Sequence, residues 1–118
     1  MDQRTQRIRD LNDRFRKGIA RGMYMMSPGI SQLGEEAVDR IVKIVAALEA
    51  VLPADHSHEE HAVGTFEAEG RTMVFKIYCF DNDLKYQSPD PADPAVTVRV
   101  MEVMLDHEYW FLLPAFRS

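Results

Sequence analysis

The stretch HAVGTFEAEGRTMVFKIYCFDNDLKYQSPDPADP, residues 61–94, decides the fold of this chain. Its first half places two apolar runs on either side of Glu69-Gly70. Glycine at the second position is typical of a two-residue hairpin turn, because it takes a positive φ without steric cost. With Glu69 and Gly70 as the turn, Ala68 lies opposite Arg71 and the rest of the register follows. The sequence therefore predicts a β-hairpin from strands 61–68 and 71–80.

This register gives the hairpin one apolar face and one mixed face. Side chains alternate along a strand, so every second residue shares a face. The apolar face carries Ala62, Gly64, Phe66, Met73, Phe75 and Ile77. We expect it to cover the core, with Gly64 leaving room for the ring of Phe75. The other face, on which His61 lies opposite Tyr78 and Val63 opposite Lys76, is predicted to be mixed and mostly polar.

Size and composition indicate a single globular domain, residues 1–118. Hydrophobic residues make up 46% of the chain and charged residues 28%, a balance that is typical of such a domain. No apolar run approaches the roughly 18 residues of a membrane helix. The charged start, MDQRTQRIRD, does not resemble a secretion signal, so we predict a cytoplasmic protein without membrane contact. The single cysteine, Cys79, fits a reducing compartment and is interpreted as a buried or half-buried strand residue.

Two segments have the apolar periodicity of an amphipathic helix, residues 3–19 and residues 35–51. Their apolar stripes are Ile8, Leu11, Phe15 and Ile19 in the first, and Ala37, Ile41, Ile44, Val45, Leu48 and Val51 in the second. The short apolar run at 23–27, stopped by Ser27-Pro28-Gly29, indicates a strand.

Residues 94–107 are ambiguous, because alternating valines favour a strand while Met101, Met104 and Leu105 step like a helix. Asp93-Pro94 resembles a helix cap with proline in the first turn, and with the length of the segment it favours a helix. We therefore predict an α+β fold. Its sheet is three-stranded and mainly antiparallel, from 23–27, 61–68 and 71–80, and helices 3–19, 35–51 and 94–107 pack on one face.

Two groups of side chains could support enzyme chemistry. A small metal- or His-dependent hydrolase would use the hairpin face, with His61 as base beside Lys76, Tyr78 and Asp81. Metal ligands could come from His56, His58 and His61, or from the carboxylates of Asp81, Asp83, Asp90 and Asp93. The histidine spacing matches no strong zinc motif, and aspartate also suits turns and caps. We favour a solvated loop and ordinary cross-strand pairs, and predict no cofactor.

Charge is spread unevenly along this chain, whose net charge is −5. Residues 1–22 hold seven Arg or Lys residues against three Asp. A nucleic-acid contact could therefore use Arg4, Arg7, Arg14, Arg16 and Lys17. Because acids interrupt this run and no aromatic residues are interleaved, we favour the interpretation that it faces solvent or the acidic remainder of its own chain.

The acidic, proline-rich loop 81–93 is the predicted partner-binding surface. The residues assigned to it are Asp81, Asp83, Lys85, Tyr86, Ser88, Asp90 and Asp93. Its carboxylates could compete for a basic groove, so we predict a non-enzymatic interaction protein whose binding weakens with salt. The apolar end of the chain further predicts a homodimer through Tyr109, Trp110 and Phe111.

The chain resembles a family of small proteobacterial proteins of unknown function that are often encoded on plasmids and other mobile elements. The stretches that carry the resemblance are IRDLNDRFR (8–16), EEHAVGTFEAEG (59–70), VFKIYCFDNDLKYQSPDPADPAVTVRVMEVML (74–105) and HEYW (107–110). The most distinctive parts are Lys-Ile-x-x-x-Asp at 76–81 and Ser-Pro-Asp-Pro-Ala-Asp-Pro at 88–94. The resemblance implies a bacterial cytosolic setting and supplies no catalytic residue. It favours a regulator or inhibitor of a nucleic-acid-handling or host-defence system.

Overall fold

The central hairpin has the register that the sequence predicts. A computed structural model of the chain describes residues 1–49, 51 and 59–109. In it, β2 (Val63–Ala68) pairs antiparallel with β3 (Arg71–Phe80), and Gly64 lies opposite Phe75. Glu69 and Gly70 both have positive φ, 55° and 71°, as a tight hairpin turn requires. The predicted register is therefore confirmed, although β2 begins two residues later than expected.

Residues 94–107 form mainly a strand, so the predicted helix there is wrong. Asp93 does act as a cap, because its carboxylate accepts a bond from the Ala95 N–H. The helix that follows is only the 3-10 turn η2 (Pro94–Val96), after which the chain extends as β4 (Val98–Leu105). All of β4 after Val98 is buried. Because both faces of this central strand are covered, apolar residues occupy both alternation positions and the two-residue period is lost.

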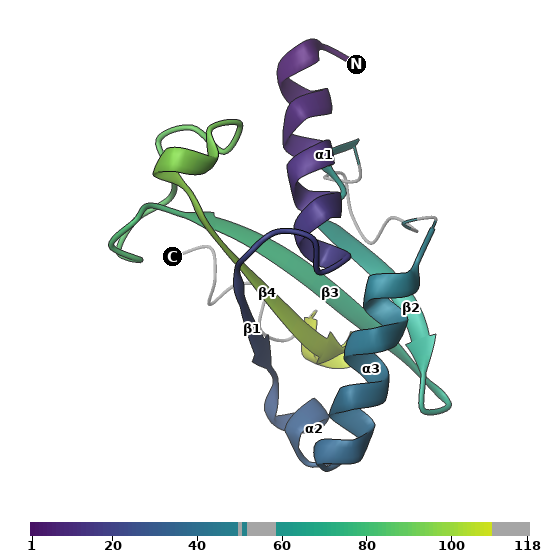
Figure 1. Cartoon of the computed structure of the whole chain (residues 1–118). Helices are drawn as coiled ribbons and strands as arrows, with labels where there is room; N and C mark the ends of the chain where they lie inside the picture. The colour runs from purple at the N-terminus through teal and green to yellow at the C-terminus, as the bar shows by residue number, and fades with distance from the viewer. Residues whose placement is uncertain (50, 52–58, 110–118) are drawn as a thin grey trace.

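The sheet is four-stranded and mixed, in the order β1-β4-β3-β2 (Figure 1). β1 (Met23–Met26) pairs parallel with β4, and the other neighbours pair antiparallel. The prediction of an α+β fold is confirmed. The predicted number of three strands is wrong, and two of the three neighbouring pairs are antiparallel. The difference comes from β4, which enters the sheet between β1 and β3.

Two long helices cover one face of the sheet, as predicted (Figure 1). The short helix α2 (Pro28–Ser31) packs against the same core. α1 (Gln3–Arg16) is capped by Asp2, and α3 (Glu35–Ala47) ends where Leu48 becomes extended. Both are shorter than the predicted 3–19 and 35–51. The core they form with the sheet contains Phe15, Ile30, Ile41, Val45, Phe66, Ala68, Met73, Phe75, Ile77, Met101, Val103 and Leu105. No helix among the described residues is long and apolar enough to cross a membrane.

The second face of the sheet is less polar than the sequence predicts. Val63 and Val74 are buried there with Met104 and Tyr109. Residues 106–109 are helical and bring the Tyr109 side chain onto this face. Of the residues predicted to form a homodimer, Tyr109 is thus buried in its own chain, while Trp110 and Phe111 lie outside the described residues.

Gly64 should not tolerate a larger residue. A Cβ atom there would lie 2.5 Å from Cε2 of Phe75 and 2.7 Å from Cγ1 of Val51. We expect Gly64→Ala to lower the free energy of unfolding by about 2 kcal/mol, because the fully buried Phe75 ring must shift. Urea denaturation measures this. The matched control is Glu67→Ala, an exposed change on the same strand, which should stay within about 0.5 kcal/mol. Wild-type stability of Gly64→Ala would contradict the packing.

Candidate functional site

The chain between β3 and β4, residues 81–97, forms a loop that its own side chains hold in place; we call it the β3–β4 loop. The Asp81 carboxylate accepts bonds from the N–H groups of Lys85 (3.0 Å) and Tyr86 (3.4 Å). The Asp81 N–H donates to the Tyr86 carbonyl at 2.8 Å, and Leu84 takes a positive φ of 59°. Farther on, the Ser88 N–H donates to the Cys79 carbonyl at 2.9 Å. Asp81 therefore stabilises the turn that contains residues 83–86.

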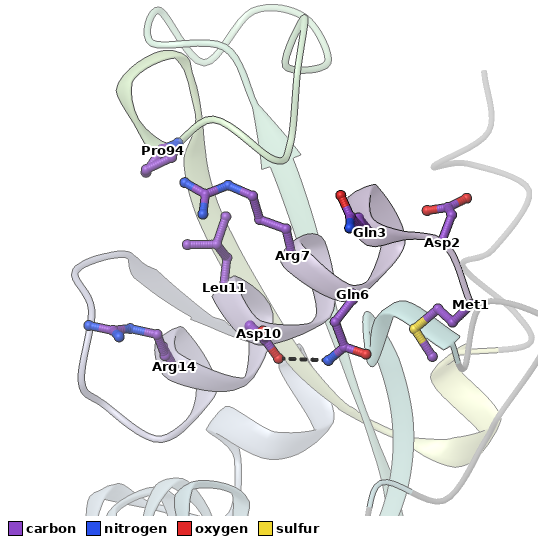
Figure 2. Close-up of a pocket in the computed structure, with 9 residues that line it drawn as sticks. All are labelled: Met1, Asp2, Gln3, Gln6, Arg7, Asp10, Leu11, Arg14 and Pro94. Carbon is purple, nitrogen blue, oxygen red and sulfur yellow. Dashed lines mark hydrogen bonds between the residues drawn. The ribbon is translucent and has the colours of Figure 1, made fainter.

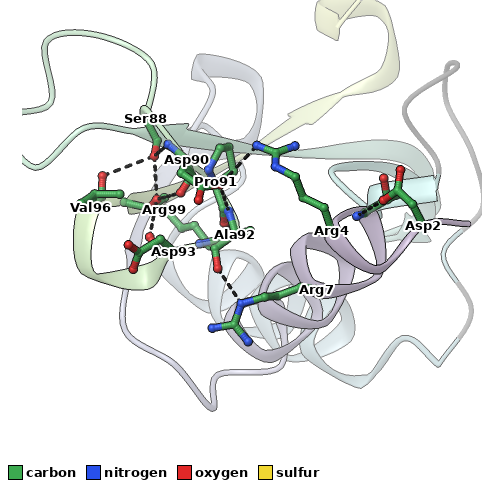
Figure 3. Close-up of polar contacts among 12 residues, drawn as sticks. Asp2, Arg4, Arg7, Ser88, Asp90, Pro91, Ala92, Asp93, Val96 and Arg99 are labelled. Atoms are coloured by element: carbon green, nitrogen blue, oxygen red, sulfur yellow. Dashed lines mark hydrogen bonds and ion pairs between the residues drawn. The ribbon is translucent and has the colours of Figure 1, made fainter.

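The second half of the β3–β4 loop contains the Ser-Pro-Asp-Pro-Ala-Asp-Pro stretch, and its polar atoms bond to one another (Figure 3). The Ser88 hydroxyl lies 2.7 Å from the Thr97 hydroxyl and accepts from the Asp90 N–H at 3.1 Å. The carboxylates of Asp90 and Asp93 each accept a bond from an N–H two residues on. Proline restricts φ and aspartate supplies local acceptors, so this composition favours a single loop conformation.

Three arginines fasten the β3–β4 loop to the rest of the protein (Figure 3). The buried Arg99 of β4 donates to Asn12 Oδ1 of α1 and to the Pro91 carbonyl, both at 2.7 Å. From α1, Arg7 Nε donates to the Ala92 carbonyl at 2.7 Å. Arg4 forms an exposed ion pair with Asp90 at 3.2 Å. The loop is thus bonded to both β4 and α1. These bonds hold the loop in one conformation before any partner binds.

The β3–β4 loop exposes two large side chains, Leu84 at 45% and Tyr86 at 75%. Beside them, Asp83 and Lys85 are also exposed, as is Asp93 farther along. Of the seven predicted partner-binding residues, Asp81, Ser88 and Asp90 are half-buried and build the loop. Leu84 was missed by the prediction. The sequence feature that could have identified Leu84 is its position as an apolar residue within a stretch of acids and prolines.

The four residues of the possible hydrolase site do not meet at one place. The His61 ring lies 2.9 Å from the Asp13 carboxylate of α1, and His61 precedes β2 with a positive φ of 54°. Asp81 bonds to the backbone of its own turn. A cavity of about 650 Å³ is lined by Lys76 and Tyr78, but by neither His61 nor Asp81. The expected pairing of His61 with Tyr78 across the hairpin is therefore absent from the register of β2 and β3.

Lys76 and Tyr78 belong to a polar cluster with Glu102 on the second face of the sheet. The Tyr78 hydroxyl donates to Glu102 Oε1 at 3.2 Å, and Lys76 Nζ lies 4.9 Å from the centre of the Tyr78 ring. Burial raises the pKa of Tyr78 and also that of Glu102. Burial likewise raises the pKa of the half-buried Cys79 thiol, in agreement with its interpretation as a strand residue. A phenol and a thiol with raised pKa values are poorly suited to act as nucleophiles at neutral pH.

Metal ligands do not gather in the part of the chain that the structure describes. Within residues 1–49, 51 and 59–109, no group of three or more His, Cys, Asp or Glu side chains could hold an ion. His56 and His58 lie outside these ranges. The carboxylates of Asp81, Asp90 and Asp93 accept bonds from backbone N–H groups instead.

The basic N-terminal residues are partly used within the protein. Arg4 and Arg7 hold the β3–β4 loop, and Arg16 is buried under α3. Of the five residues predicted to contact nucleic acid, only Arg16 is buried. Arg14 and Lys17 are exposed and form no salt bridge to any described residue. A hollow of about 730 Å³ runs along the outer side of α1 and is lined by Asp2 and Asp10 as well as by Arg7 and Arg14 (Figure 2). The charges along it are therefore mixed.

Comparison with known proteins identifies a family but no activity. A family model described as "Protein of unknown function (DUF3768)" matches residues 26–108, which is most of the chain. The matched region holds β2, β3, β4 and the β3–β4 loop, and α1 precedes it. Neither the curated proteins nor the solved structures gave a match. On this match, the chain belongs to the DUF3768 family of proteins of unknown function.

Proposed function

We propose that this protein is a non-enzymatic interaction protein that binds a protein partner through the tip of the β3–β4 loop. The observation that carries the proposal is the exposure of Leu84 and Tyr86 on a loop that Asp81 and Arg99 hold in place. Tyrosine is enriched among the residues that dominate binding energy at interfaces. A loop that is already ordered loses little conformational entropy on binding.

The chemistry of the loop favours a partner with a basic surface. Asp83 is exposed beside Leu84, Asp93 is exposed farther along the loop, and the whole chain has a net charge of −5. Proteins that handle nucleic acid carry such basic surfaces. The proposed role is therefore that of a regulator or inhibitor of a nucleic-acid-handling or host-defence system in the bacterial cytoplasm. Its encoding on mobile elements rests on the family resemblance described above.

An enzymatic function is the weaker proposal. A hydrolase would need His61, Lys76, Tyr78 and Asp81 to meet at one substrate. His61 instead bonds to Asp13, and Asp81 bonds to backbone N–H groups. Direct nucleic-acid binding through α1 would depend on Arg14 and Lys17, which are exposed and take no part in holding the β3–β4 loop.

Exchanging Asp83 and Tyr86 at the tip of the β3–β4 loop should weaken partner capture without unfolding the protein. We expect the double variant Asp83→Arg, Tyr86→Ala to bind its partner at least about tenfold more weakly, since the loss of one interface tyrosine often costs more than 1 kcal/mol. The measurement is an affinity pull-down from bacterial cytosol, read by mass spectrometry and followed by titration of the captured protein. Wild-type binding should also weaken as salt is raised.

The matched control is Glu67→Arg, which reverses an exposed acid on β2, away from the loop. It should keep the partner if the loop is the binding surface. Equal capture by the double variant, or binding that does not respond to salt, would contradict the proposal.

A further inference from the structure

A cavity of about 650 Å³ opens at the outer edge of β3, where β2 no longer covers this strand. β2 begins at Val63, and just before it the Ala62 carbonyl accepts a bond from the Ile77 N–H at 2.7 Å. Farther along β3, the Cys79 carbonyl accepts a bond from the Ser88 N–H of the β3–β4 loop at 2.9 Å. The residues of both bonds line the cavity, which therefore lies between these two attachments. Its volume is in the range of small-molecule sites.

The position of the cavity limits what can enter it. Ala62 and Ser88 occupy the edge of β3 on either side, so a foreign strand cannot pair along this edge, whereas a small molecule can bind there. The N–H and C=O groups of a strand residue point to the same side, so the Cys79 N–H points into the gap beside Ser88. No hydrogen bond among the described residues uses this N–H. It is therefore available to an acceptor on a ligand.

Two side chains of opposite charge, Glu60 and Lys85, line the cavity from its two walls. The Glu60 side chain is half-buried, and neither charged group forms a salt bridge or a side-chain hydrogen bond within the described residues. The third charged residue of the lining is Lys76. Its ammonium lies 4.9 Å from the centre of the Tyr78 ring and interacts electrostatically with Glu102. The cavity therefore suits a ligand with one positive and one negative group.

We propose that this cavity binds a free α-amino acid with an aromatic or large apolar side chain. The α-ammonium pairs with the Glu60 carboxylate, and the α-carboxylate accepts from the Cys79 N–H on the side of Lys85. The ligand side chain packs on the rings of Phe80 and Tyr86, which line the cavity, and Tyr86 is 75% exposed. An α-amino acid fits because it joins a positive, a negative and an apolar group at a single carbon atom.

Calorimetric titration of the full chain with free amino acids tests the class of ligand. Phenylalanine and leucine should bind with dissociation constants below about 1 mM. Aspartate should bind at least about tenfold more weakly, because it has no apolar group to place on the two rings. Absence of binding by every aromatic and large apolar amino acid, or equal binding of aspartate, would overturn the proposal.

Two variants that each remove one charge test the position of the site. Glu60→Gln and Lys85→Gln should each weaken phenylalanine binding at least about fivefold, because each removes the partner of one ligand charge. The matched controls are Glu59→Gln and Lys43→Gln, which change exposed residues outside the cavity lining and should bind like the wild type. The amide resonance of Cys79 should also move during an NMR titration with phenylalanine. Unchanged binding by either test variant, or an unmoved Cys79 resonance, would overturn the assigned site.

The amino-acid site does not rest on the proposed function, because the titration needs no protein partner. The cavity shares Lys85 and Tyr86 with the tip of the β3–β4 loop, so variants outside these shared residues separate the two activities. Asp83→Arg should weaken partner capture and keep phenylalanine binding, whereas Glu60→Gln should do the reverse. A wild-type chain that binds phenylalanine but captures no partner would contradict only the proposed function. The opposite result would overturn only the amino-acid site.

Discussion

Replacing Arg16 with alanine is expected to lower the free energy of unfolding by about 3–5 kcal/mol, the largest effect of any single change considered for this protein. Arg16 is only 2% exposed. Its Nη1 atom donates to the carbonyls of Val45 (2.8 Å) and Leu48 (2.9 Å) at the C-terminal end of α3. The guanidinium also lies 5.8 Å from the centre of the Phe75 ring. Alanine would leave two helix-end carbonyls unpaired and a cavity in the core.

Chemical denaturation monitored by circular dichroism measures this effect. Arg14→Ala is the matched control, since Arg14 is exposed on the same helix and should change stability by less than about 0.5 kcal/mol. Arg16→Lys should recover only part of the loss, because one ammonium cannot reproduce the fork of the guanidinium. Similar stability of Arg16→Ala and Arg14→Ala would show that Arg16 does not join α1 to α3.

Arg99→Ala is expected to cost about 2–4 kcal/mol of stability and to loosen the β3–β4 loop. Arg99 connects β4 to Asn12 of α1 and to the Pro91 carbonyl of the loop, with both bonds at 2.7 Å. Without it, the loop keeps its internal bonds but loses its buried attachment. The loop would then have to become ordered on binding. This loss of conformational entropy should also weaken partner capture.

Two measurements separate these effects. Denaturation gives the change in stability, and amide hydrogen exchange of residues 81–97 should become faster in the folded Arg99→Ala protein. Arg71→Ala, an exposed arginine of β3, is the control and should change neither. Asn12→Ala should loosen the loop in the same way, and combining it with Arg99→Ala should add less than the sum of the two single effects. Unchanged exchange in Arg99→Ala would refute this anchoring role.

Local sequence was sufficient for the hairpin and for the two long helices. Glu69-Gly70 sets the turn, and a slip by one residue would bury Lys76, so turn and pattern agree on one register. The stripes of α1 and α3 face the sheet because their apolar residues recur at helical spacing. The sequence did less well at the helix ends, where Gly18, with its positive φ of 81°, follows α1 two residues after its last helical residue.

For the candidate site, the sequence located the loop but not the roles of its residues. Asp81, Ser88 and Asp90 were assigned to partner binding, yet they hold the loop through bonds to nearby backbone groups. A polar residue in a loop can either bind a partner or bond to the backbone of its own loop. The sequence pattern is the same in both cases, so it cannot separate the two roles. The anchors Arg7 and Arg99 come from 85 and 8 residues away from their acceptors, Ala92 and Pro91.

The sequence by itself determined the hairpin register, the α+β class and the position of an acidic loop after β3, because each follows from contacts between residues close in the chain. Only the tertiary structure decided that 98–105 is a strand, that β1 pairs parallel with it, and that basic residues of α1 hold the acidic loop. A strand buried on both faces loses its alternation, and pairing between β1 and β4 joins segments more than seventy residues apart. Which partner a charged or apolar side chain meets over such a separation depends on how the elements pack.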